Sequence, residues 1–221
     1  MRNPLNSLFL GLVLAAMPLV AWPAADPGAS PQQVVEGAVK NISRQLDGRR
    51  DQLSANRKEL YSLIDRELLP DFDTDYAGRL VLGKAWRDAT AEQRKRFVDA
   101  FYNFLLRSYA TAVLKFDQKN FRILPERAPP QDGRTSVETE MRMPDGSTVP
   151  VSYAMRQTDA GWKAYDVRIE GVSYVQNYRN QFNAEVAAKG LDELIGRLER
   201  ETAEIDAGRR SPDAPSPAKG G

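Results

Sequence analysis

Over the first half of the chain the apolar positions recur every three or four residues, which is the period of an amphipathic helix. The pattern predicts helices at 31–46, about 55–69, about 74–82 and 91–114. Ser30 is a typical N-cap for the first helix, and Thr90 with Gln93 forms a capping box for the last. Apolar side chains surround the axis over 97–114, which indicates a helix at the centre of the fold.

From Asn120 the period changes from helical to alternating, which predicts β-strands. The expected strands cover about 121–124, 137–143, 149–155 and 162–169. Asp145-Gly146 fits a tight hairpin turn between the second and the third strand. Helical spacing returns over 172–189 and from Gly190 to about residue 205. The sequence therefore predicts an α+β fold, with a curved antiparallel sheet of about four strands wrapped by helices.

One face of the predicted sheet is apolar along its whole length. It carries Val137, Thr139, Met141, Met143, Val149, Val151, Tyr153, Met155, Tyr165, Val167 and Ile169. If the helices cover this face incompletely, the fold becomes a cone with an apolar interior pocket. Periodicity does not distinguish a filled core from a lined pocket, so both interpretations stay open on the residues alone.

The first 25 residues have the pattern of a secretory signal peptide. A basic Arg2 precedes an apolar run from Leu8 to Val20, and small residues follow. The run is shorter than the roughly 20 apolar residues that a membrane-spanning helix needs. We therefore expect a signal peptide at 1–25, one domain at 26–205 and a disordered C-terminal tail at 206–221.

The composition excludes several kinds of chemistry. The 221 residues include no Cys and no His, which removes disulfides, thiol nucleophiles, imidazole bases and Cys–His metal sites. The formal net charge is +1, and Arg2 is the only charged residue in the predicted signal peptide, so the exported chain is neutral. A neutral chain without a basic stripe is not expected to bind nucleic acid. The lack of Cys suits an oxidising space such as a bacterial periplasm.

Asp71, Asp73 and Asp75 have the spacing that opens a calcium-binding loop. However, Tyr76 stands where such a loop requires Gly, and Leu82 stands where it requires a bidentate Glu. We interpret the three aspartates as caps of the helix that follows, and no metal site is expected.

A second acidic group lies on the predicted sheet. Glu138, Glu140, Asp166 and Glu170 fall mainly on the face opposite the apolar one, where they alternate with arginines. This pattern is typical of a solvated charged face rather than of a catalytic acid–base pair. No catalytic residue is therefore expected.

Two segments carry a resemblance to a known family. The first extends from Leu69-Pro70 through Leu80-Val81-Leu82-Gly83 to Tyr109. The second is Gly161-Trp162-Lys163-Ala164-Tyr165-Asp166-Val167, followed by Ile169-Glu170-Gly171-Val172-Ser173. In order and spacing they resemble the MlaC family of periplasmic lipid carriers, also called the toluene-tolerance family. The resemblance covers about residues 31–205, and the second segment is the more specific.

The resemblance implies a soluble periplasmic phospholipid carrier with a nuclear-transport-factor-like cone, in which acyl tails lie between sheet and helices. It implies no covalent chemistry and no cofactor, with phospholipid bound as cargo. The implied partners are an outer-membrane lipoprotein–porin complex and an inner-membrane ABC transporter with an MCE-domain subunit, and the traffic would maintain outer-membrane lipid asymmetry. The expected lipid-binding residues are Phe97, Phe101, Phe104, Leu105, Val137, Met141, Val149, Val151, Tyr153, Met155, Val167, Ile169, Val172, Ser173, Tyr174 and Tyr178.

Two other functions remain open on the residues alone. A non-catalytic periplasmic adaptor or chaperone would have a fully packed interior. A small-molecule enzyme on the same cone would need a carboxylate with a raised pKa pointing into the apolar interior. Strand alternation places no carboxylate there.

Overall fold

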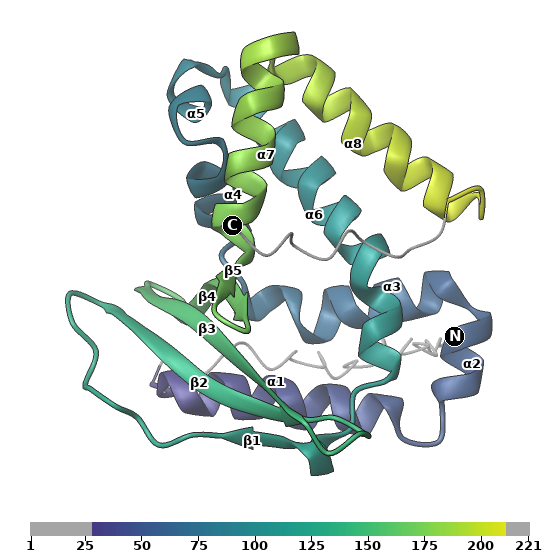
Figure 1. Ribbon diagram of the computed structural model, residues 1–221, viewed down its shortest axis with the longest axis vertical. Coiled ribbons are helices and arrows are strands. Elements are labelled where there is room, and N and C mark those ends of the chain that lie inside the picture. The colour runs from purple at the N-terminus through teal and green to yellow at the C-terminus, as the bar shows by residue number, and fades with distance from the viewer. Residues whose placement is uncertain (1–27, 211–221) are drawn as a thin grey trace, which may run out of the picture.

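The described part of the computed structural model, residues 28–210, contains eight α-helices and a five-stranded antiparallel sheet (Figure 1). The helices before the sheet are α1 Pro31–Leu46, α2 Arg50–Ala55, α3 Arg57–Glu67, α4 Thr74–Leu82, α5 Lys84–Asp88 and α6 Ala91–Leu114. Those after it are α7 Tyr174–Lys189 and α8 Leu191–Asp206, and the short 3-10 turns are η1 Leu69–Asp71 and η2 Gln118–Asn120. This order of elements confirms the predicted α+β class.

The sheet is a meander, in which each strand pairs with the next one along the chain. Its strands are β1 Phe121–Ile123, β2 Arg134–Arg142, β3 Thr148–Thr158, β4 Gly161–Ile169 and β5 Val172–Ser173. Antiparallel pairing places Val137, Tyr153 and Val167 next to one another across the three long strands. The predicted meander is confirmed, and the two-residue β5 adds a strand to the four that were expected.

The capping residues begin α1 and α6 where the sequence predicts. The Ser30 side chain accepts from the Gln33 backbone N–H, and the Gln33 side chain in turn accepts from the Ser30 N–H at 2.7 Å. Thr90 and Gln93 form the same reciprocal pair at the start of α6. Each box satisfies backbone donors that have no partner inside the helix.

Of the three aspartates interpreted as caps, one has that role. Asp73 accepts from the Tyr76 backbone N–H at 3.0 Å and is the N-cap of α4. Asp71 belongs to η1, and Asp75 lies in the first turn of α4. The capping interpretation is therefore confirmed at Asp73 and wrong at the other two.

Several helices differ from those expected. The helix expected at about 55–69 is α3 alone, because Asn56 ends α2 and its side chain caps α3. The helix expected from Val172 begins at Tyr174, since Val172 and Ser173 first pair with β4. The short α5 after Gly83 was not expected.

Three separate hydrophobic clusters hold the described part together. The first joins α4, α6, α7 and α8, and the second joins α2, α3, α6 and the C-terminal half of α1. The third places α1 against the sheet, with Val34 and Val35 packed on Val137 and Met155. Figure 1 shows α1 along the sheet and α6, α7 and α8 extending away from it. As predicted, α6 is central, because it contributes to two of the clusters.

The predicted signal peptide at 1–25 lies outside the described residues, and so does most of the predicted tail, from residue 211 onward. Helix α8 ends at Asp206, close to the expected domain boundary. Among residues 28–210, no helix is both long and apolar enough to cross a membrane.

Candidate functional site

The apolar face of the sheet is the candidate site, and strand register defines its members. Directly paired residues of an antiparallel sheet share a face, and alternate residues along each strand do so too. The face carries Phe121, Ile123, Val137, Thr139, Met141, Val149, Val151, Tyr153, Met155, Ala164, Val167, Ile169 and Val172. Phe121 and Ile123 were not among the expected contacts. Their alternation with Arg122 in the sequence could have placed both on the apolar face.

Helix α1 covers one end of this face. Val137 and Met155 are 2% and 0% exposed, and both pack against Val34 and Val35 of α1. Ala164 of β4 belongs to the same cluster. This end is ordinary protein core, so Val137 and Met155, two of the expected lipid contacts, are already covered by protein.

The side chains at the other end of the face do not pack into the α1 cluster. Six apolar side chains there are partly exposed and belong to none of the three core clusters or to the side chains packed against them. They are Met141, Val149, Val151, Val167, Ile169 and Val172. They adjoin one another, since Val151 pairs with Ile169 and Ile169 pairs with Val172. We call these six side chains the open apolar face.

Adjoining apolar side chains that stay partly exposed can form a binding surface. Every side chain in it is aliphatic or a thioether, and none can ionise or donate a strong hydrogen bond. Methionine also adapts its shape to different apolar partners. The open apolar face therefore suits a hydrocarbon ligand, and it offers no group for acid–base or nucleophilic chemistry.

Tyr153 lies where the open apolar face meets the covered end. Its ring packs against the α1 cluster, and register places it between Val137 and Val167. The surrounding protein desolvates the phenol and raises its pKa to about 12. The side chain nevertheless remains partly exposed. Tyr153 is therefore largely surrounded by protein and yet accessible, as expected for a residue that lines a concave surface.

A buried carboxylate joins the sheet to α7. Asp166 is 6% exposed and accepts hydrogen bonds from Ser173 Oγ at 2.6 Å and from the Val175 backbone N–H at 3.0 Å. Ser173 also accepts from the Gln176 N–H as the N-cap of α7. The expectation of a wholly solvated charged face is therefore wrong for Asp166, because the start of α7 packs over it.

Three tyrosines meet between α6 and the start of α7. The hydroxyl oxygens of Tyr109 and Tyr178 are 3.4 Å apart, and the ring centroids of Tyr109 and Tyr174 are 5.6 Å apart. Burial raises the pKa of all three phenols, so they are neutral at ordinary pH. Tyr174 and Tyr178 were expected contacts, and the structure pairs them with Tyr109.

The expected contacts on α6 and α7 lie mostly in the helical core. Phe97, Phe101, Phe104 and Tyr178 are each at most 7% exposed, and Leu105 packs against them. The Phe101 ring alone lies 5.0 Å from the Tyr178 ring and 5.4 Å from the ring of Phe182. The structure thus brings the sheet residues of the expected site together and places these helix residues in a filled cluster.

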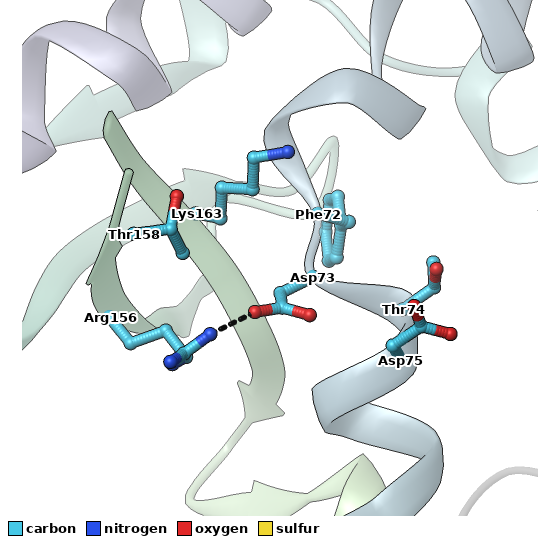
Figure 2. A pocket seen from close by; sticks show the side chains of 7 residues that line it. All are labelled: Phe72, Asp73, Thr74, Asp75, Arg156, Thr158 and Lys163. Carbon is cyan, nitrogen blue, oxygen red and sulfur yellow. Dashed lines mark hydrogen bonds and ion pairs between the residues drawn. The ribbon is translucent and has the colours of Figure 1, made fainter. Parts of the chain in front are cut away.

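A polar hollow lies at the start of α4, away from the open apolar face (Figure 2). Phe72, Asp73, Thr74, Asp75, Arg156, Thr158 and Lys163 line it. Figure 2 shows the ion pair between Asp73 and Arg156 that ties α4 to β3. The two carboxylates and two cations leave little apolar surface for a hydrocarbon chain. Within residues 28–210, no group of acidic side chains is arranged to hold a metal ion.

The chain is similar to proteins of one known family. Residues 36–200 match the family described as MlaC protein. The toluene tolerance protein ttg2D of Pseudomonas putida is 28% identical over 183 residues, which cover 82% of each chain. The intermembrane phospholipid transport system binding protein MlaC of Haemophilus influenzae is 21% identical over 178 residues, covering 79% of this chain and 83% of the relative.

A solved structure has the same fold. It is the phospholipid-binding protein from Ralstonia solanacearum, determined in complex with a phospholipid. The match has a TM-score of 0.74 at 27% identity and covers 80% of this chain and 99% of the other. Because the family match spans well over half of the 221 residues, this chain belongs to the MlaC protein family.

Proposed function

We propose that this protein is a periplasmic phospholipid carrier that holds the acyl chains of its cargo against the open apolar face. The observation that carries the proposal is the group of six adjoining, partly exposed apolar side chains that belong to none of the three core clusters. The solved relative that was determined with a phospholipid supports the same ligand class. Bound acyl tails would extend the hydrophobic cluster that α1 forms with the sheet.

The free energy of burying two acyl chains explains why a dedicated carrier is needed. Each buried CH₂ contributes about 0.8 kcal/mol, so two tails of roughly 15 methylenes gain on the order of 24 kcal/mol relative to water. A phospholipid will therefore not leave the protein for water at a useful rate. Release requires a partner that offers the tails a comparably apolar path.

The partners are those that membership of the MlaC family implies, and the expected location is consistent with them. The N-terminal pattern predicts export, and the absence of Cys suits an oxidising compartment. We infer that the carrier exchanges lipid with an outer-membrane lipoprotein–porin complex and with an inner-membrane ABC transporter that has an MCE-domain subunit. This traffic would maintain the lipid asymmetry of the outer membrane.

The carrier would not alter its cargo chemically. The chain contains no His and no Cys. The carboxylates of Glu138 and Asp166 lie on the opposite side of the sheet from the open apolar face, because their register partners Ser152 and Ala154 alternate with Val151 and Tyr153. Asp166 is also held by Ser173 and Val175. Neither of these two carboxylates therefore faces the bound ester groups.

Native mass spectrometry of the exported chain, purified without detergent, tests the proposal. We expect a mass excess equal to one phospholipid, which is lost on denaturation and recovered in an organic extract. A chain that is folded by circular dichroism, carries no lipid and takes none up from phospholipid vesicles would contradict the carrier function. That outcome would favour the adaptor instead.

A further inference from the structure

Tyr153 presents a hydroxyl that no other described residue satisfies. The neighbouring polar side chain on the same face, Thr139, donates to the Val151 carbonyl oxygen at 2.8 Å. Elsewhere in the molecule the Tyr102 hydroxyl bonds to Asp65, and that of Tyr109 meets Tyr178. Within residues 28–210 no such hydrogen bond exists for Tyr153, and its hydroxyl is not among the fully buried polar atoms.

The surroundings of this hydroxyl restrict what its partner can be. The cross-strand neighbours of Tyr153 are Val137 and Val167, which offer no side-chain donor or acceptor. The adjacent positions on the same face of β3 are Val151 and Met155, which offer no strong one either. A phenol in apolar surroundings usually finds a hydrogen-bond partner. No described side-chain polar atom is buried without one, so the Tyr153 hydroxyl is accessible to a partner from outside the chain, either water or a bound ligand.

We propose that the Tyr153 hydroxyl donates a hydrogen bond to an ester carbonyl oxygen of the bound lipid. This inference rests on the proposed carrier function and adds a residue that fixes how deeply the cargo sits. The ester carbonyls are the polar atoms nearest the acyl chains, and they accept hydrogen bonds but cannot donate them. Tyr153 has the matching donor at the inner boundary of the open apolar face.

The consequence is a preference for ester-linked over ether-linked cargo. A diether phospholipid has the same headgroup and nearly the same tails, but it lacks the two carbonyl oxygens. A neutral hydrogen bond of ordinary strength corresponds to a factor of about three to ten in affinity. The wild-type protein should therefore select the diester lipid over the diether lipid by about that factor.

The experiment is a two-by-two comparison of protein and lipid. Wild type and Tyr153→Phe are stripped of lipid, exposed to vesicles that contain equal amounts of diester and diether phosphatidylglycerol with saturated tails, and analysed by native mass spectrometry. We expect a three- to tenfold diester preference in wild type and a ratio near one in Tyr153→Phe. Tyr165→Phe is the matched control. Tyr165 was expected on the apolar face, but an irregularity in the pairing of β3 with β4 leaves it out of the register, and its ring packs edge-on against Tyr76 at 5.1 Å.

The outcomes separate the two claims. If wild type takes up both lipids equally, or if Tyr153→Phe keeps the wild-type preference, the role of Tyr153 is wrong while the carrier function stands. If wild type takes up neither lipid, the carrier function itself fails. A lower melting temperature of lipid-free Tyr153→Phe than of lipid-free wild type would show that the hydroxyl has a partner inside the protein, which also overturns the proposal.

Discussion

Asp71 carries a carboxyl group whose ionisation opposes folding. It ends η1, where burial raises its pKa from the ordinary 3.8 to about 6, and the nearby charge of Lys163 only partly offsets the effect. In the unfolded chain the group loses its proton at a pH about two units lower. Between these pH values the folded protein holds the proton and the unfolded chain does not.

This difference predicts how stability changes with pH. Because the folded state binds more protons between about pH 4 and pH 6, the contribution of Asp71 to the free energy of unfolding falls as the pH rises through that window. Asp71→Asn removes the titration, so its stability advantage over wild type should be small at pH 4 and larger at pH 7.5. Urea unfolding of both proteins at the two pH values measures it. An advantage that is independent of pH would show that Asp71 ionises normally.

At the scale of elements, the close contact between α4 and α6 depends on a glycine. A Cβ placed on Gly78 would lie 2.8 Å from Cγ2 of Val98, which is closer than real side chains approach. Gly37 in the middle of α1 has nothing within 4 Å of the same position. Both are helical glycines, so the two sites differ mainly in the space available.

Replacement of each glycine by alanine should therefore have opposite effects. Gly37→Ala should raise the free energy of unfolding by about 0.5–1 kcal/mol, because alanine lowers the entropy of the unfolded chain and favours the helix. Gly78→Ala should lower it by about 1–3 kcal/mol, because α4 must move away from α6. Chemical denaturation measures both changes. A stabilised Gly78→Ala would mean that α4 and α6 are packed less tightly than described.

Elements with strong local signals could be predicted from the sequence, and elements fixed by tertiary contacts could not. The capping boxes of Ser30 and Thr90 and the alternation along β2 and β3 are local, and each gave the correct element. By contrast, β5 forms because Val172 pairs with Ile169. A segment of two residues is too short to show the alternation that predicts a strand.

The same distinction applies to the candidate site. Alternation identified the residues of the apolar face, because side-chain direction in a strand is a local property. The position of α1 on the sheet depends on tertiary packing, which the local pattern does not show. Met155 and Val151 therefore looked equivalent in the sequence, although only Met155 is buried. Likewise, Phe97 and Phe101 were expected at the site from the family resemblance, whereas α7 and α8 pack against them.

At the scale of the whole molecule, each helical cluster is completed by its own side chains and the sheet cluster is not. The first two clusters are built wholly from helices, and the third consists of α1 and the covered end of the sheet. The uncovered end is where a ligand would contribute the missing apolar contacts. Cargo should therefore act as part of the fold.

This arrangement predicts that the loaded protein is the more stable form. A ligand that binds only the folded state adds about 2.7 kcal/mol when its free concentration is 100 times its dissociation constant. Removal of the lipid should lower the melting temperature, and reloading from vesicles should restore it. Scanning calorimetry on the two forms measures the shift. Equal melting temperatures would mean that the lipid does not occupy the uncovered part of the core.

The most direct test places one negative charge on either face of the same strand. Val151 lies on the open apolar face, while Ser152 faces the other way, between Glu138 and Arg168. Val151→Glu should fold and be purified without phospholipid, because a buried unpaired carboxylate costs several kcal/mol. Ser152→Glu should keep its lipid. Phospholipid per protein after detergent-free purification is the measurement. Full lipid content in folded Val151→Glu would contradict the assignment of the acyl chains to this face.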